Sequence, residues 1–536
     1  MAQKNKKTAV VIIVAVVLAV LIVGGFFLLY KPEPKGLKVG ISTLPDSLNP
    51  VLEQNTSGRN ADELLFDGLV NTEVEPQDKK LISEFGLADS ITQDPETKKT
   101  YNVTLKDVTW HDGHKLTAKD VEFSYAAYMD PANNSPQRSY LDSFIESVKA
   151  VDNQNLVIEF RKPIPEFRAY PVLTFKIIPA EYKGKQLSTN LRAGDLEREF
   201  ATSPVGTGPF MIDSWEIGKW ITFKANKDYF KGKPASESLV LQNIIDPVVR
   251  MNEFQNKRIN LILETSPADR ASVEKMAGLD INSYLPYAFY QVAINSKNAD
   301  FSSAAAREAL VSAVNPSGLV PGITDKEDLT LVNYGPFPTN IFSGNFPDYK
   351  VDPLADTRIK GEDAVKQALS DAGLVGKTYA LMFPDSMGNF GQSIADGIAA
   401  QFAAYGVTVE VKRTGDQVFQ RLVYNEKNYD LALQYCEGFD NLYSDLYKYY
   451  STNGSENIYG IADPALDNLF NTWNATVVTE DWINVTREIH NRICEEAPAI
   501  PLFSIQKDVY SHGIRNIAIA SDNPFLSVEF WSQGSK

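Results

Sequence analysis

The chain has 536 residues, with 52 lysine and arginine residues against 68 aspartate and glutamate residues, a formal net charge of −16 and two cysteines. Its length predicts roughly three to five domain-sized units. Charged residues at 22% and hydrophobic residues at 43% are ordinary globular values, which disfavours a disordered, collagen-like, disulfide-knotted or polytopic membrane protein. The acidic balance disfavours a nucleic-acid-binding protein, because an acidic surface repels phosphate backbones.

One apolar segment near the N-terminus departs from this average. Residues 8–30 carry no formal charge and follow Lys4, Lys6 and Lys7. A helix of about 20 apolar residues spans a bilayer core, whereas the core of a secretory signal is usually about 7–15 residues long. Residues 1–36 are therefore predicted to hold a tail, an uncleaved single-pass signal anchor and a spacer, with a cleaved signal as the alternative.

The segment after the spacer begins with a predicted strand at residues 37–41, and the region of about residues 60–200 is predicted to form a compact α+β lobe. Residues 100–110 alternate polar and apolar side chains, which is typical of a strand. Thr117 is placed to cap a following helix, because its hydroxyl precedes apolar residues at helical spacing. Residues 148–151 and 156–160 flank a polar turn and predict a hairpin.

The region from 360 to 435 predicts a parallel sheet. In chain order the pattern gives a helix, a strand, a helix and two strands over residues 362–372, 379–383, 394–405, 407–411 and 429–435. A strand, a helix and a strand within about 35 residues form a βαβ unit, which implies a parallel α/β lobe. Ligands bind beyond the carboxyl ends of the strands in such sheets. That rule favours the residues at and just after Tyr435, namely Cys436, Glu437, Gly438, Phe439 and Asp440.

The sequence offers no complete catalytic or metal motif. His111 and His114 have the spacing of two metal ligands but do not complete a zinc site, so a structural turn is favoured. Ser272 and Lys275 match the first motif of penicillin-recognising serine enzymes, but the order and spacing of the other two motifs fail. We therefore predict no enzyme, no metal and no cofactor, and keep a serine hydrolase that uses Ser272 as a disfavoured alternative.

Cysteines and aromatic residues gather near the last predicted strand. Cys436 and Cys494 permit either a disulfide or two buried thiols, because sequence gives no distance between them. Among the aromatic residues that follow, those at helical spacing are predicted to form the core side of one helix: Tyr443, Tyr447 and Tyr450. Tyr435 and Phe439 are the better cleft candidates, because they lie at the strand end.

Several segments together resemble one family. Residues 109–121 read TWHDGHKLTAKDV, which resembles the signature of the family 5 extracellular solute-binding proteins of ABC importers, the oligopeptide- and dipeptide-binding group. Residues 204–210, PVGTGPF, and 226–234, NKDYFKGKP, are similar to that family's second hallmark. Segments 45–50, 306–315 and 497–502 also fit in the family's order.

The resemblance implies an α/β, periplasmic-binding-protein-like fold of class II with three lobes and no chemistry on the ligand. Two α/β lobes would be joined by a hinge of two crossings, near residues 285–295 and 498–505, and would close on a ligand between them. Lobe I would comprise residues 37–59, 201–290 and 502–536, the inserted α+β lobe II residues 60–200, and lobe III residues 291–501.

The resemblance also implies where a ligand binds. The backbone of Gln54, Asn55 and Thr56 would pair with an extended peptide as an added strand. The opposite wall would comprise residues 434–440, with Gln434, Tyr435, Cys436, Glu437, Gly438, Phe439 and Asp440, and Tyr287 and Tyr290 would lie at the first crossing. Oligopeptide binders place an aspartate in this wall against the ligand's α-ammonium group. Gly438 stands there in this chain, which favours uncharged ligands unless Glu437 or Asp440 replaces that aspartate.

The predicted function is therefore an extracytoplasmic, membrane-anchored receptor that delivers peptides to an ABC permease and its ATPase. An oligosaccharide or another small solute is the alternative ligand, since aromatic walls serve sugars too. A ligand-sensing or adhesive surface protein that kept the fold is a further alternative. Residues 1–38 hold six lysines and one glutamate, so residues 39–536 carry −21. With that charge, ligand binding must depend on local cleft geometry rather than on attraction of anions.

Overall fold

The computed structural model describes residues 34–534 except for 54, 76–79, 264, 266–268, 323–329, 339–357, 437–441, 477 and 522. The predicted anchor over residues 8–30 lies outside the described residues. Within the described ranges, no helix is both long and apolar enough to cross a membrane.

A seven-stranded sheet, the first sheet, is assembled from three separate parts of the chain. Its strand order is β10-β11-β12-β1-β13-β21-β14, and β1 runs parallel to both of its neighbours, β12 and β13. The predicted first strand, residues 37–41, is confirmed and lies in the middle of this sheet. The strands are β1 (Leu37–Ile41), β10 (Phe210–Glu216), β11 (Trp220–Ala225), β12 (Ser238–Asn243), β13 (Leu261–Ile262), β14 (Leu279–Tyr284) and β21 (Lys507–His512).

Helices cover both faces of the first sheet. α7 (Pro247–Gln255) and α8 (Arg270–Val273) contribute to a small core with Ile262 and Tyr510. α2 (Thr56–Leu65) buries Leu64 and Leu65 in the main core, which continues into the neighbouring inserted body. Two short pairs lie beside them: β2 (Val70–Glu75) with β3 (Lys80–Phe85), and β22 (Ile514–Arg515) with β23 (Ser532–Gln533).

The inserted body is an antiparallel sheet of order β4-β5-β7-β6 packed against α3. The predicted strand near residue 100 and the hairpin are confirmed. Thr117 is the N-cap of α3, and its N–H donates to the carboxylate of Asp120 at 2.7 Å, which completes a capping box. Its elements are β4 (Ala88–Gln93), β5 (Thr100–Leu105), α3 (Ala118–Met129), α4 (Arg138–Phe144), β6 (Ile145–Ala150), β7 (Asn155–Phe160), α5 (Glu166–Val172), β8 (Glu181–Tyr182), β9 (Lys185–Gln186) and α6 (Asp195–Thr202).

A six-stranded sheet, the second sheet, has the order β16-β20-β15-β19-β17-β18. The βαβ unit is confirmed, because β17, α12 and β18 follow one another and the two strands pair in parallel. α11 (Glu362–Asp371) ends before Gly373, whose φ of +68° suits the left-handed residue after a helix. The strands are β15 (Phe289–Ile294), β16 (Thr330–Val332), β17 (Thr378–Pro384), β18 (Thr408–Thr414), β19 (Leu431–Cys436) and β20 (Ala499–Ile505).

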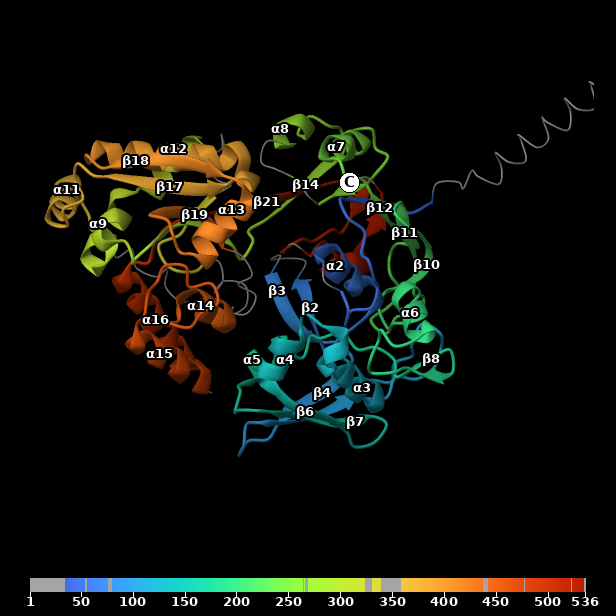
Figure 1. Ribbon diagram of the computed structural model, residues 1–536. Coiled ribbons are helices and arrows are strands. Elements are labelled where there is room, and N and C mark those ends of the chain that lie inside the picture. Colours follow the sequence, from blue (N-terminus) through green and yellow to red (C-terminus); the bar gives the residue numbers. More distant parts are fainter. Residues whose placement is uncertain are drawn as a thin grey trace, which may run out of the picture.

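Helices also cover both faces of the second sheet (Figure 1). One core contains side chains of α9, α11 and α12, and the other contains side chains of α14, α15 and α16. The helices are α9 (Ala304–Ala313), α11 (Glu362–Asp371), α12 (Gly388–Ala404), α13 (Asp416–Phe419), α14 (Leu442–Tyr450), α15 (Pro464–Ala475) and α16 (Thr479–Glu496).

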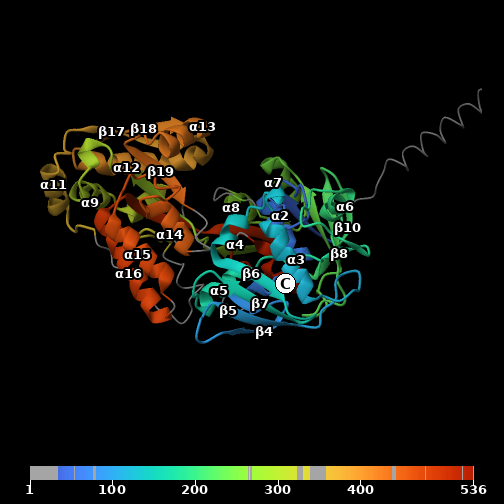
Figure 2. The same ribbon diagram turned by 60° about the horizontal axis from the view of Figure 1, so that its bottom comes forward.

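The chain passes between the two sheets twice. β14 leads into β15 through residues 285–288, and β20 leads into β21 through Gln506 alone. The first crossing is shorter than predicted and the second lies one residue beyond its predicted range, because residues 289–294 and 499–505 are strands of the second sheet. Figures 1 and 2 show the body built on the second sheet beside the body formed by the first sheet and the inserted body.

Candidate functional site

A row of three aromatic side chains crosses the second sheet next to the crossings. In the strand register Tyr290 of β15 stands between Phe503 of β20 and Tyr435 of β19. The ring centroid of Tyr290 lies 4.8 Å from that of Tyr435 and 5.9 Å from that of Phe503. Such spacings stabilise aromatic pairs. Phe503 is buried, whereas Tyr290 and Tyr435 are half-buried, so these two form the open part of what we call the aromatic row.

The aromatic row lies where parallel strands end. Tyr435 is the penultimate residue of β19, and Phe390 near the start of α12, just beyond the carboxyl end of β17, lies 5.2 Å from Tyr290 between ring centroids. In open α/β sheets this edge receives ligands. The structure therefore brings two of the predicted site residues, Tyr290 and Tyr435, together at the favoured edge.

Lys507 joins the aromatic row from the other sheet. It is the first residue of β21, and its Nζ lies 5.9 Å from the centroid of the Tyr435 ring. A lysine over an aromatic face is attracted by the ring quadrupole. The sequence analysis did not predict this residue. A charged residue directly after the second crossing would have been a signal, but the sequence did not locate that crossing at a single residue.

The structure divides the predicted wall between two faces of β19. Gln434 and Cys436 are buried on the face opposite to Tyr435, because successive side chains of a strand alternate. There the Gln291 amide donates to Gln434 Oε1 at 3.0 Å and to the Tyr459 hydroxyl at 2.6 Å. These groups satisfy one another, and the network is a core feature of the second sheet.

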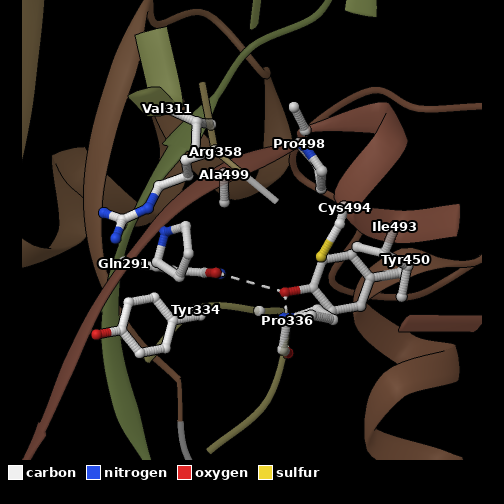
Figure 3. A pocket seen from close by; sticks show the side chains of 13 residues that line it. Gln291, Val311, Tyr334, Pro336, Arg358, Tyr450, Ile493, Cys494, Pro498 and Ala499 are labelled. Atoms are coloured by element: carbon white, nitrogen blue, oxygen red, sulfur yellow. Dashed lines mark hydrogen bonds between the residues drawn. The ribbon is translucent and has the colours of Figure 1, made fainter. Parts of the chain in front are cut away.

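A small pocket adjoins this buried network (Figure 3). Figure 3 shows the Tyr450 hydroxyl directed at Gln291, to whose Oε1 it donates at 3.4 Å. Burial raises the pKa of that hydroxyl well above its usual range, so it stays protonated and able to donate. Cys494 also lines the pocket, and Cys436 and Cys494 are thiols that form no disulfide. The pocket contains no member of the aromatic row.

The remaining predicted site residues lie elsewhere. Tyr287 is half-buried in the first crossing and packs against the core that contains α14, α15 and α16. Five predicted residues lie outside the described residues: Gln54, Glu437, Gly438, Phe439 and Asp440.

The structure differs from the extended segment expected at residues 54–56. Asn55 is the N-cap of α2, where its side chain accepts from the Gly58 N–H at 2.8 Å, and Thr56 is the first helical residue. The Asn55 N–H donates to Glu53 Oε1 at 2.8 Å, and its carbonyl accepts from the Arg59 N–H at 3.1 Å. Because both backbone groups of Asn55 are used, an added strand there would have to displace these bonds; the role of Asn55 and Thr56 in binding stays a prediction.

A second contact joins the two bodies away from the crossings. Phe167 of α5 packs edge-on against Trp482 of α16, with ring centroids 5.5 Å apart. Arg168 donates to the carbonyl oxygen of Trp473 at 3.4 Å and to Asn474 Oδ1 at 3.5 Å. Both views place α5 on the side of the inserted body that faces α15 and α16 (Figures 1 and 2). We call this the α5 contact.

Hydrogen bonds of the His111 ring join its turn to the segment that holds Gly206 and Gly208. The Gly206 N–H donates to His111 Nδ1 at 3.1 Å, which leaves Nε2–H to donate to the Gly208 carbonyl oxygen at 3.0 Å. Burial lowers the pKa of His111 to about 4, so the ring is neutral at pH 7. In the part of the chain that the structure describes, no group of three or more histidine, cysteine, aspartate or glutamate residues is placed to hold a metal ion.

Among the described residues, the hydrogen-bond partners of Ser272 include no general base. The Ser272 hydroxyl donates to the carbonyl oxygen of Asp269 at 2.7 Å, and Gln255 Nε2 lies 3.5 Å from the same hydroxyl. An activated serine requires a general base within hydrogen-bond reach. A carbonyl oxygen and an amide do not take a proton from it, so the alternative based on Ser272 gains no support.

Comparison with known proteins agrees with this architecture. The profile of the bacterial extracellular solute-binding proteins, family 5 middle, matches residues 84–459. Protein XP55 of Streptomyces lividans is 30% identical over 303 residues, 56% of this chain and 52% of that protein, so the match spans about half of that relative. The oligopeptide-binding protein AppA of Bacillus subtilis is 25% identical over 396 residues, 71% of this chain and 70% of that protein.

A solved structure supports the fold over nearly the whole chain. The ABC transporter substrate binding protein CtaP of Listeria monocytogenes aligns with a TM-score of 0.80 at 21% identity, over 94% of this chain and 100% of that one. The α/β, periplasmic-binding-protein-like fold predicted from the sequence is thus confirmed. Because the family profile matches more than half of its residues, the chain belongs to the bacterial extracellular solute-binding proteins of family 5.

Proposed function

We propose that this protein is the substrate-binding receptor of an ABC importer and captures oligopeptides or dipeptides between its two bodies. The observation that carries the proposal is the family match over residues 84–459, combined with an aromatic row placed at the junction of two sheets that the chain crosses twice. A ligand that contacts both bodies shifts the population toward the closed state by its extra contacts there.

The lobe boundaries belong to the same proposal. Lobe I comprises residues 37–59, 201–290 and 502–536, lobe II residues 60–200 and lobe III residues 291–501. The first sheet draws its strands from within lobe I, and the second sheet draws its strands from residues 289–505, which supports the division except at its two borders. There, residues 289–290 and 502–505 belong to strands of the second sheet. The two short crossings serve as the hinge, because few residues have to change their backbone angles for the bodies to move.

Peptides are the first choice of ligand, because a relative matching 71% of this chain carries the name oligopeptide-binding protein. Thermal-shift screening of residues 34–536 against peptide pools and oligosaccharide pools tests the choice, since a ligand that binds only the folded state raises its stability. Stabilisation by peptide pools is expected. Stabilisation by oligosaccharides alone would replace the peptide proposal with the sugar alternative.

A solute-binding protein needs no chemistry on its ligand, and the hydrogen bonds of Ser272 fit that view. Incubation with a fluorophosphonate or a β-lactam probe, followed by intact mass measurement, is expected to give no adduct. An adduct that disappears in Ser272→Ala would revive the hydrolase alternative.

Membrane anchoring is part of the proposal as well. We propose that residues 8–30 hold the protein in the cell membrane with the large domain outside the cytoplasm. There the large domain would bind the permease, whose transport cycle an ATPase drives. Fractionation of cells expressing the full chain should place it in the membrane pellet, and a chain secreted from residue 34 onward should be soluble. If cells that express the full chain instead yield a soluble protein that has lost its N-terminal residues, the segment is a cleaved signal.

A further inference from the structure

Lys507 is a cation at the junction of the two bodies to which neither the fold nor the proposed function gives a role. It is half-buried and follows the one-residue crossing at Gln506. Its Nζ lies over Tyr435, which belongs to the other sheet. Lys507 therefore moves with the first sheet and Tyr435 with the second when the bodies open or close.

The neighbouring carboxylate does not neutralise Lys507. Asp508 is buried on the opposite face of β21 and accepts from the Ser283 hydroxyl at 2.6 Å and from Arg270 Nη1 at 3.1 Å. Among the residues that the structure describes, no carboxylate makes an ion pair with Lys507, although other lysine and arginine side chains pair with carboxylates, many of them on the exposed surface.

A half-buried cation that makes no ion pair within the described residues can bind an anion. Removal from water costs free energy for an ammonium group unless it is paired, and a carboxylate supplies the pairing and a charge-assisted hydrogen bond. Residues 39–536 together carry a net charge of −21. An anionic ligand therefore gains binding free energy from local contact with a cation and not from the overall field of the protein.

We propose that Lys507 binds a carboxylate of the ligand, with the ring of Tyr435 supporting the adjacent apolar part. This inference rests on the proposed function and specifies its ligand class: peptides that present a carboxylate at the hinge. The carboxylate is either the C-terminal group of the peptide or an acidic side chain. A ligand held between Lys507 and the aromatic row contacts both bodies, so its binding favours closure.

Binding measurements with three defined tetrapeptide pools distinguish the C-terminal carboxylate from an acidic side chain. One pool contains neutral residues and a free C-terminal carboxylate, a second has the same residues with a C-terminal amide, and a third is amidated but carries one aspartate or glutamate. Dissociation constants are measured by calorimetry for the wild type, Lys507→Met and Lys507→Arg. Lys227→Met, which removes an exposed lysine from the same body, is the matched control.

The wild type is expected to bind one carboxylate-bearing pool about ten- to a hundredfold more tightly than the neutral amide pool. A preference for the free acid identifies the C-terminal group, and a preference for the third pool identifies a side chain. Lys507→Met should lose this preference, Lys507→Arg should keep part of it, and Lys227→Met should keep all of it. Unchanged thermal midpoints without peptide show that the variants fold.

Two results would overturn the inference while leaving the peptide receptor intact: equal binding of all three pools by the wild type, or a preference that survives in Lys507→Met. Failure of the proposed function looks different. In that case no pool binds the wild type or any variant, and the carboxylate inference falls with it.

Discussion

The inserted body, taken together with residues 65–75 that precede it, touches two neighbours, and the two contacts are built differently. At its junction with the first sheet, Asp67 is 2% exposed and accepts hydrogen bonds from Asn71 Nδ2 at 2.7 Å, Thr207 Oγ1 at 2.9 Å and the Tyr229 hydroxyl at 3.0 Å. The α5 contact with the second body has one edge-on ring pair and two hydrogen bonds of 3.4 Å and 3.5 Å made by Arg168.

The difference indicates which contact holds and which one opens. A buried network in which each polar group is paired stiffens the elements that it joins, and breaking one member leaves the others unsatisfied. A contact of few groups opens at small cost. The proposed closure around a ligand would require this division, since the first sheet and the inserted body would then have to move together against the body built on the second sheet.

The largest expected effect comes from Gly206→Ala. A Cβ at this position would lie 1.7 Å from the carbonyl oxygen of Leu65, a backbone atom that already accepts from the Gly208 N–H. Because backbone has to shift on both sides, we expect a loss of about 4 kcal/mol or more in the free energy of unfolding, measured by denaturant titration. Gly415→Ala, whose Cβ would meet nothing closer than 3.8 Å, is the control and should change little. Equal stability of the two variants would mean that the junction is not closely packed.

Asp67→Ala is the next largest. The substitution removes the acceptor shared by Asn71, Thr207 and Tyr229, and buried donors left unsatisfied should lower the free energy of unfolding by about 3 kcal/mol. Asp67→Asn keeps the shape and one acceptor and should cost less. A loss below about 1 kcal/mol in Asp67→Ala would show that water replaces the carboxylate, and the junction would then resemble the α5 contact.

Local signals predicted most of the elements on both sides of this comparison. Thr117 with Asp120, and Gly373 after its helix, mark helix ends through chemistry within four residues. The sequence also contained enough information to divide Gln434, Tyr435 and Cys436 between two faces. Because successive side chains of a strand point to opposite faces, Tyr435 had to lie opposite to the other two. Asn55 before a helix is a cap signal that the extended interpretation overlooked.

The contacts between bodies had no such signal. Phe167 and Trp482 are 315 positions apart, and nothing near either residue indicates the other. Lys507 meets Tyr435 because β21 of the first sheet follows β20 of the second sheet after Gln506 alone, and β20 and β19 flank the same strand, β15. Such contacts depend on the three-dimensional arrangement of lobes, which pattern reasoning on one sequence supplies only through resemblance to a family.

The pH dependence of the unfolding free energy tests the junction through His111, with a smaller expected effect than the substitutions above. Burial lowers the pKa of His111 to about 4, so between about pH 6.5 and 4 the unfolded chain binds a proton that the folded chain does not. The contribution is fully present above pH 6.5 and is lost as the pH falls toward 4. His490 and His512, whose pKa values burial also lowers, act in the same direction.

His111→Gln isolates one of these three contributions. The glutamine amide offers an acceptor for the Gly206 N–H and a donor for the Gly208 carbonyl, as the ring does, but it does not titrate. The unfolding free energy of the variant, measured from pH 7.5 to 4.5, should fall less steeply than that of the wild type. Parallel curves would mean that His111 is equally protonated in the folded and unfolded chains.

Phe167→Ala has the smallest expected effect on stability and the most direct bearing on closure. Loss of an edge-on aromatic pair costs about 1 kcal/mol. Because the contact lies between bodies that each have their own core, we expect the loss to shift the proposed equilibrium between open and closed arrangements more than the free energy of unfolding. The radius of gyration without ligand, measured by small-angle scattering, should rise relative to the control Val151→Ala, which truncates a side chain 67% exposed on the same body. An unchanged radius of gyration would mean that the two crossings alone determine how the bodies lie relative to each other, and that the α5 contact does not contribute.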